Sequence, residues 1–132
     1  MTNLELAEYL RRVASAYKIL DENRFKIIAY ERAADSIERL TSEVKDYWDE
    51  GKLHEIPGVG AGIAQVIDEI FKTGKSKHID EVLKKVPSAV FPLLNVPGLG
   101  PKKAFKLVTI LNLNNSNTVL TDLEKAAKSH KI

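Results

Sequence analysis

Apolar residues recur at helical spacing through the first part of the chain. Between Asn3 and Leu20 they fall three or four positions apart, which predicts an amphipathic helix over residues 3–20. The triplet Asp-Glu-Asn at 21–23 is a turn and cap signal, and a second helix is expected over about 24–40. The inward face of this second helix is predicted to comprise Phe25, Ile28, Ala29, Ala33, Ser36, Ile37 and Leu40.

The remaining chain is predicted to form further short helices. Thr41 or Ser42 is expected to cap a third helix that continues through Trp48 and is closed by Gly51. Later helices are predicted at 61–72, from 76 to the proline at 87, at 101–111 and around 118–128. A short apolar segment lies at 88–95 and a loop at 112–117. No segment alternates over more than a few residues, so the predicted fold class is all-α, with short packed helices.

A segment rich in proline and glycine occurs twice. The stretch "IPGVGAGIA" at 56–64 is repeated as "VPGLGPKKA" at 96–104, 40 residues later, and each copy lies between two predicted helices. A chance glycine cluster seldom recurs together with its flanking residues, so the repeat indicates a structural unit. A dinucleotide-binding fingerprint needs G-x-G-x-x-G after a strand, and a P-loop needs G-K-[ST]. Neither copy meets these requirements, which excludes both nucleotide-binding motifs.

Composition narrows the possible partners. The 132 residues include no cysteine and three scattered histidines, His54, His78 and His130, so no disulfide and no zinc site is expected. No apolar run approaches the roughly 20 residues that span a bilayer, and the N-terminus does not resemble a secretory signal. Net charge changes from −3 over residues 1–50 to +1 over 51–100 and +4 over 101–132. The basic C-terminal third is a hint of a polyanionic partner.

The order helix, apolar–Pro–Gly–apolar–Gly, helix is the pattern of a helix-hairpin-helix motif. Gly58 and Gly98 can adopt positive φ in the turn, while Gly60 and Gly100 have no Cβ to obstruct a phosphate. The following helix presents free N–H groups and the positive end of its dipole, so sequence-independent binding of a DNA backbone is expected. A protein-docking module with purely structural hairpins is the alternative. The hairpin residues predicted to contact DNA are Gly58, Val59, Gly60, Ala61, Gly62, Gly98, Leu99, Gly100, Pro101, Lys102, Lys103 and Lys106.

The whole chain resembles the N-terminal part of a family X DNA polymerase, the DNA polymerase beta relatives, and is most similar to the bacterial and archaeal members. The residues that carry this resemblance are "FKIIAYERAADSI" at 25–37, "LHEIPGVGAGIAQVIDEIFKTGK" at 53–75 and "LNVPGLGPKKAFKL" at 94–107. The resemblance implies a helical domain at 1–86 that carries the first hairpin and binds the 5′-phosphate side of a gap. It also implies a subdomain at 87–132 whose hairpin grips the primer side.

The resemblance has further implications for the setting of the chain. It implies gapped, nicked or primer-template DNA as the partner, no membrane, a monomer, and a role in DNA repair in the cytoplasm of a prokaryote. The polymerase carboxylates of the family, with their Mg²⁺, belong to a palm outside these 132 residues. The chain is therefore expected to be part of a longer nucleotidyltransferase and not to polymerise DNA by itself.

The resemblance also implies an activity, the removal of a 5′-deoxyribose phosphate through a Schiff base on a lysine. The family pattern I-A-x-K-I-x-E appears here as I-A-Q-V-I-D-E at 63–69, so Val66 stands at the position of the nucleophile. Valine cannot form an imine. We therefore expect no catalytic residue and little or no lyase activity. The alternative is a lyase that uses another amine, for which Lys26 is the candidate.

Other family positions around the 5′ phosphate are matched only in part. Lys26, Tyr30 and Arg32 match them and are predicted to contact DNA, whereas Glu31 and His78 stand where the relatives have basic residues. A monovalent cation, Na⁺ or K⁺, is also implied at each hairpin, held by backbone carbonyls and bridging to phosphate. By position these carbonyls belong to His54, Ile56 and Val59 in the first hairpin and to Leu94, Val96 and Leu99 in the second. No organic cofactor is implied.

Overall fold

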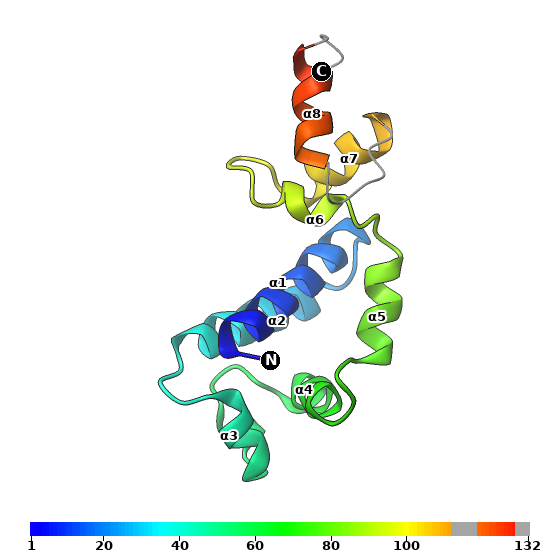
Figure 1. Ribbon diagram of the computed structural model, residues 1–132. Coiled ribbons are helices and arrows are strands. Elements are labelled where there is room, and N and C mark those ends of the chain that lie inside the picture. The colour runs from blue at the N-terminus through cyan, green and yellow to red at the C-terminus, as the bar shows by residue number, and fades with distance from the viewer. Residues whose placement is uncertain (112–118, 129–132) are drawn as a thin grey trace. The chain divides into compact units, whose positions relative to one another are not determined.

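The computed structural model describes residues 1–111 and 119–128 as a set of helices, and the predicted all-α class is confirmed (Figure 1). The loop predicted at 112–117, the start of the last helix at Thr118, and His130 lie outside the described residues. In the described part no segment is a strand, and no helix is long and apolar enough to cross a membrane. The chain divides into two compact units, residues 1–83 and 84–132.

The first unit is built on a pair of long helices, α1 (Asn3–Ile19) and α2 (Arg24–Arg39), which pack along one another. Thr2 and Glu5 form a reciprocal capping box at the start of α1. The helices bury small and branched residues against each other, and each of these is fully buried: Leu6, Ala7, Leu10, Val13, Ala33, Ala34 and Ile37. Burial of this apolar face is the main stabilising contribution to the unit.

Phe25 was predicted to point inward, and that prediction is wrong. Its side chain is 82% exposed. Phe25 lies in the first turn of α2 and, at about 100° per residue, some 140° around the helix from the buried Tyr30. Of the other predicted inward positions on this helix, Ala33 and Ile37 are buried and Ser36 is half-buried. The helix phase set by the α1 contact therefore leaves this aromatic ring in solvent.

The predicted cap of the third helix is also wrong. Helix α3 (Val44–Asp49) begins after Glu43, and no local side chain caps it. The amide of Asn3, from the start of α1, takes that role. Its Oδ1 accepts a hydrogen bond from the Val44 N–H at 2.8 Å, and its Nδ2 donates to the Ser42 carbonyl at 2.9 Å. The orphan N–H of α3 is thus satisfied by a residue 41 positions away.

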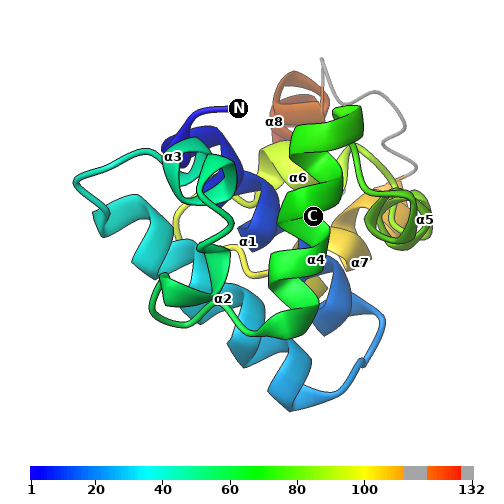
Figure 2. The ribbon, with the colours of Figure 1, turned by 90° about the horizontal axis from the view of Figure 1, so that it is seen from below.

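The short helix η1 (Leu53–Glu55), α4 (Ala61–Thr73) and α5 (Lys77–Lys84) follow one another in sequence. Figures 1 and 2 show α3, α4 and α5 succeeding each other along one side of the α1–α2 pair. Trp48 of α3 stacks on Phe71 of α4 at 5.3 Å between ring centroids, and its Nε1–H donates to Asp68 at 2.8 Å. Gly74, with φ of +85°, ends α4.

The second unit contains α6 (Val90–Leu93), α7 (Pro101–Leu111) and α8 (Val119–Lys128). Helix α6 packs against both α7 and α8. The described core of this unit is small and apolar, and its most buried members are Val86, Ala89, Val90, Leu93, Ala104, Val108 and Val119. Pro101 opens α7 at its first position, where the missing N–H costs nothing.

Candidate nucleic-acid interface

The two copies of the glycine-rich segment have the same backbone geometry. In each, the turn is closed by a 3.1 Å hydrogen bond, from Val59 N–H to the Ile56 carbonyl in the first copy and from Leu99 N–H to the Val96 carbonyl in the second. The helix that follows is opened by a 2.9 Å bond in both copies, Ala64 N–H to Gly60 and Ala104 N–H to Gly100. The sequence repeat is therefore a repeat of conformation.

Gly58 and Gly98 have the conformation that the sequence predicted for the turn. Both have φ of +79°, a region that side chains rarely adopt. The surroundings of the two differ. A Cβ on Gly58 would lie 3.3 Å from the carbonyl oxygen of Arg32 in α2, whereas one on Gly98 would meet nothing within 4 Å. The first turn is thus packed closely on α2, at the backbone carbonyl of Arg32.

Gly60, Gly62 and Gly100 have no internal reason to be glycine. None has positive φ, all are exposed, and a Cβ on any of them would meet nothing within 4 Å. Gly60 itself is extended, with φ of −83° and ψ of −179°. Glycine weakens a helix relative to alanine, so its presence at the start of α4 carries a stability cost without a packing benefit. The open backbone leaves space for an external group to approach.

The helices after both turns carry no acidic residue in their first turn. The positive ends of the α4 and α7 dipoles are therefore not neutralised locally. After the second turn, Lys102, Lys103 and Lys106 are all exposed. Lys102 and Lys106 share one face of α7, because residues four apart lie one turn above each other. The second hairpin thus combines a helix N-terminus with exposed ammonium groups, a combination that suits an anion.

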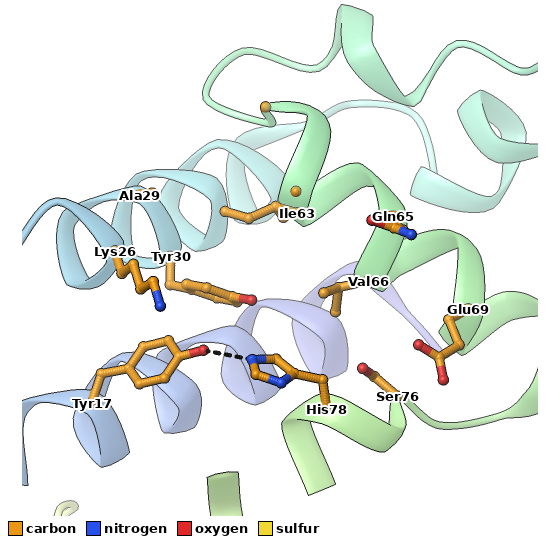
Figure 3. A pocket seen from close by; sticks show the side chains of 12 residues that line it. Tyr17, Lys26, Ala29, Tyr30, Ile63, Gln65, Val66, Glu69, Ser76 and His78 are labelled. Carbon is orange, nitrogen blue, oxygen red and sulfur yellow. Dashed lines mark hydrogen bonds between the residues drawn. The ribbon is translucent and has the colours of Figure 1, made fainter. Parts of the chain in front are cut away.

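Beside the first hairpin lies a pocket of about 510 Å³ (Figure 3). It is formed by α1, α2, α4, the residue before α5, and α5 itself. The lining residues are Tyr17, Lys26, Ala29, Tyr30, Gly60, Gly62, Ile63, Gln65, Val66, Glu69, Ser76 and His78. The pocket therefore brings together Lys26, Tyr30, Gly60 and Gly62 of the residues predicted to contact DNA. It does not include Arg32, Gly58, Val59 or Ala61.

Aromatic side chains form one wall of the pocket. The rings of Tyr17 and Tyr30 meet edge to face, with centroids 5.5 Å apart. The Lys26 ammonium lies 5.9 Å from the centroid of Tyr17 and 3.6 Å from a carboxylate oxygen of Glu22. Burial, with a smaller contribution from Tyr17, raises the pKa of Tyr30, so its hydroxyl stays protonated. Tyr30 can thus donate a hydrogen bond to a ligand.

Tyr17 and Ser76 were not predicted as site residues. Tyr17 lies within the predicted first helix and is 3% exposed, but its hydroxyl faces the pocket and lies 3.5 Å from Nε2 of His78. A tyrosine on the apolar face of a helix could have indicated a polar site in the sequence, since its buried hydroxyl needs a polar partner. Ser76 is fully buried, and its Oγ accepts a hydrogen bond from the Ile79 N–H at 3.4 Å, capping α5.

Val66 lines the pocket directly, as Figure 3 shows. Among the described residues that line the pocket, Lys26 is the one that carries an amine. Glu31, at a position where the resemblance implies a basic residue, is half-buried on α2 outside the lining and pairs with Lys18 at 3.5 Å. The pocket therefore presents one ammonium group and an apolar surface at the position implied for the nucleophile.

The hairpin carbonyls offer limited support for a cation site. The oxygens of Ile56 and Val96 each accept one hydrogen bond in their turns, which leaves one lone pair on each. These two carbonyl oxygens can therefore still accept another contact, and the cation site remains a prediction. In the described part of the chain, no cluster of three or more histidine or carboxylate side chains could hold a metal ion.

Comparison with known proteins gives two kinds of similarity. A helix-hairpin-helix domain family matches residues 1–76. The chain is 30% identical over its whole length to a DNA polymerase/3′-5′ exonuclease PolX of Bacillus subtilis (strain 168), and covers 22% of that protein. It is 29% identical, over 77% of its length, to DNA polymerase lambda of Rattus norvegicus, and covers 17% of it. The chain thus spans about a fifth of these relatives.

The family match covers more than half of the chain and includes the whole first hairpin. Together with similarity to two polymerases of this group, it confirms the resemblance that the sequence indicated. The chain belongs to the helix-hairpin-helix domain family, in the form that family X DNA polymerases carry in their N-terminal region.

Proposed function

We propose that this chain binds the DNA backbone, without reading sequence, through two helix-hairpin-helix motifs, as the N-terminal part of a family X DNA polymerase that acts in repair. The observation that carries the proposal is the pair of hairpins with identical turn geometry and exposed glycines that nothing internal requires. The similarity to PolX and to DNA polymerase lambda supports DNA as the partner. Gapped, nicked or primer-template DNA is the proposed form.

Each hairpin would bind one backbone phosphate. The open side of Gly60 or Gly100 lets the phosphate approach the free N–H groups of α4 or α7, where the dipole favours negative charge. In the second hairpin, Lys102, Lys103 and Lys106 would add charge contacts. Because such contacts involve phosphates alone, they position the protein on DNA without specifying bases.

The pocket beside the first hairpin is proposed to hold the 5′ phosphate at a gap. Lys26 supplies an ammonium, Tyr30 a hydroxyl donor, and the start of α4 its N–H groups, all from the lining of one cavity. Val66 gives this cavity an apolar surface in place of a nucleophile, so the proposed role is binding without cleavage. Polymerase chemistry, with its Mg²⁺, is proposed for a part of the full protein outside these 132 residues.

Fluorescence anisotropy on gapped DNA at two salt concentrations tests the binding proposal. The expected result is binding at low salt that weakens with a log–log slope of roughly −0.9 for each phosphate neutralised. Replacing Lys102, Lys103 and Lys106 together with Gln should reduce the magnitude of that slope by about 0.9 for each phosphate that the protein no longer neutralises. Absence of binding at low salt would overturn the proposal and favour the protein-docking alternative.

Gly60→Glu and Gly100→Glu separate these two functions further. Both side chains have space in the folded protein, so the variants should fold. A carboxylate at either position would repel a phosphate and abolish the corresponding DNA contact. If the hairpins are only structural, affinity for a protein partner should be nearly unchanged in the same variants.

The lyase alternative has one supporting observation, which is that the Lys26 amine lines the pocket. Borohydride trapping on DNA that carries a 5′-deoxyribose phosphate decides between the two roles. We expect no covalent adduct, because Val66 has no amine. An adduct that disappears in Lys26→Ala would establish the lyase.

We also propose that Na⁺ or K⁺ occupies the hairpins when DNA is bound. The carbonyls of His54, Ile56 and Val59 would hold it in the first hairpin, and those of Leu94, Val96 and Leu99 in the second. The ion would supply positive charge next to a phosphate. Replacing K⁺ by a bulky organic cation at constant ionic strength should then weaken binding to DNA, and unchanged affinity would argue against the site.

A further inference from the structure

Helix α2 carries acidic and basic residues on different sides. Its acidic residues Glu31, Asp35 and Glu38 follow one another at three- and four-residue spacing and form one stripe. Glu31 lies 3.5 Å from the ammonium of Lys18 on α1. Asp35 and Glu38 lie 3.0 Å and 2.6 Å from one guanidinium, that of Arg11, also on α1. The negative charge of α2 is therefore directed at cations of its partner helix.

Arg32 and Arg39 lie on another side of this helix. They are seven residues apart, which is two helical turns to within about 20°, so both belong to one face. Both are exposed, and neither has an ion pair with a residue in the described part of the chain. Tyr30, which lines the pocket, lies about 160° around α2 from Arg32. The face with the two arginines is thus separate from the pocket lining.

The turn of the first hairpin packs on this same face. A Cβ on Gly58 would lie 3.3 Å from the Arg32 carbonyl oxygen and 3.4 Å from Oγ of Ser36. Ser36 comes four residues after Arg32 and three before Arg39, so the three residues share one stripe of α2. The two arginines therefore lie on either side of the place where the first turn meets α2. Their Cα atoms are about 10 Å apart along the helix axis, at 1.5 Å per residue.

We propose that Arg32 and Arg39 form a second contact with the DNA backbone, outside the pocket and next to the first hairpin. The inference rests on the proposed function of that hairpin. One strand of DNA carries a negative charge about every 3.4 Å along its axis, so a face about 10 Å long spans about three phosphates. A guanidinium can donate two parallel hydrogen bonds to a phosphate. The resemblance implied a place for Arg32 at the 5′ phosphate, whereas this contact lies on the strand away from its end.

Continuity with the hairpin favours DNA over an acidic protein segment as the occupant of this face. Gly60, whose open side is proposed to admit a phosphate, follows Gly58 by two residues. A strand that passes this point continues along the protein surface, and the two arginines lie beside the turn. If Arg39 served only the negative end of the α2 dipole, its loss would leave DNA binding unchanged.

Fluorescence anisotropy on gapped DNA at several salt concentrations measures the proposed contact. Replacing Arg32 and Arg39 together with Gln should reduce the magnitude of the log–log salt slope by about 1.8, which is 0.9 for each phosphate no longer neutralised. Affinity at low salt should fall about tenfold for each arginine, the worth of one charge-assisted hydrogen bond. Arg39→Lys should keep the slope and lose part of the affinity, because an ammonium cannot donate the paired bonds of a guanidinium.

Lys45→Gln is the matched control. Lys45 is an exposed cation of α3 in the same unit, without an ion pair to a described residue, and Glu43 and Asp46 lie within two residues of it. Its loss changes the net charge by the same amount as Arg39→Gln but should leave the salt slope unchanged. Urea unfolding of every variant checks folding, and because the substituted side chains are exposed, the midpoints should change little.

Two gapped DNAs that differ only in a 5′ phosphate or a 5′ hydroxyl separate this face from the pocket. The preference for the phosphorylated end is the ratio of the two affinities. It should be unchanged in the double arginine variant, because the contact involves phosphates within the strand. It should be reduced in Lys26→Ala, because the Lys26 ammonium lines the pocket.

The outcomes separate this inference from the proposed function. A salt slope that is unchanged in the double variant, or that decreases only as much as in Lys45→Gln, overturns the arginine contact and leaves binding by the hairpins intact. Loss of the preference for the 5′ phosphate in the double variant assigns Arg32 to the pocket and also overturns it. Failure of the wild-type chain to bind gapped DNA at low salt overturns both proposals. A reduced slope with an unchanged end preference supports the inference.

Discussion

The open glycines at the start of α4 should separate folding from binding. Gly62→Ala adds a methyl group at the second residue of a helix, where a Cβ meets nothing within 4 Å. Alanine is favoured over glycine in a helix by about 0.5–1 kcal/mol, so the variant should be more stable by about that amount. Gly60→Ser places a good capping side chain at the N-cap and should be neutral or stabilising by a few tenths of a kcal/mol.

DNA binding should change in the opposite direction in these variants. The added atoms occupy the space through which a phosphate reaches the α4 N–H groups. Loss of one charge-assisted hydrogen bond, worth about 1.5–3 kcal/mol, corresponds to roughly a tenfold or greater loss of affinity. A variant that gains stability and loses binding is the signature of a glycine kept for a ligand.

Urea unfolding and anisotropy on gapped DNA, performed on the same preparations, measure both quantities. Gly58→Ala is the contrasting variant, because φ of +79° and the Arg32 carbonyl at 3.3 Å both oppose a Cβ there. It should lose about 1–3 kcal/mol of stability, whereas Gly98→Ala, with the same φ and no close neighbour, should lose less. Unchanged DNA affinity in both Gly62→Ala and Gly60→Ser would refute the argument for phosphate approach.

Three further predictions concern stability. Asn3→Ala removes both hydrogen bonds that hold the start of α3 and should cost about 1–2 kcal/mol in urea unfolding, and an unchanged midpoint would mean that water replaces the cap. Tyr9→Phe should be neutral or stabilising by up to about 1 kcal/mol, because the hydroxyl is buried with no partner in the described part of the chain, and burial raises the pKa of Tyr9 to about 12; a clear loss of stability would contradict this. The hydrogen bond from Trp48 and the contact with Lys72 lower the pKa of Asp68. The ionised carboxylate therefore stabilises the folded chain at pH values above the ordinary carboxyl pKa near 4. This stability is lost as the pH falls through the lowered pKa of Asp68 in the folded state. Trp48 fluorescence should report this transition, and Asp68→Asn should remove it; persistence of the transition in that variant would assign it to another group.

Helix placement and both turns were predictable from local sequence. The turns follow from Pro–Gly and Gly–x–Gly because φ near +79° at Gly58 and Gly98 is a local backbone property that few other residues allow. Apolar spacing located α1, α2, α4 and α7 closely, since a packed helix buries one face wherever its neighbours come from. The repeat at a spacing of 40 residues was visible in the sequence because both turns need the same residue types at the same positions.

The tertiary structure decided which side chains meet. The cap of α3 comes from Asn3 and not from the adjacent Thr41 or Ser42, because the fold brings the start of α1 next to the start of α3. Phe25 is exposed because the contact between α1 and α2 sets the helix phase, which composition alone does not reveal. The pocket joins Tyr17 to His78, 61 residues apart, and places Glu69 in the same cavity as Lys26. The sequence by itself thus predicted two phosphate-binding hairpins, because their turns depend on local backbone conformation. Packing between helices that are distant in sequence decided which charged side chains, Lys26 and Glu69, face the cavity beside the first hairpin.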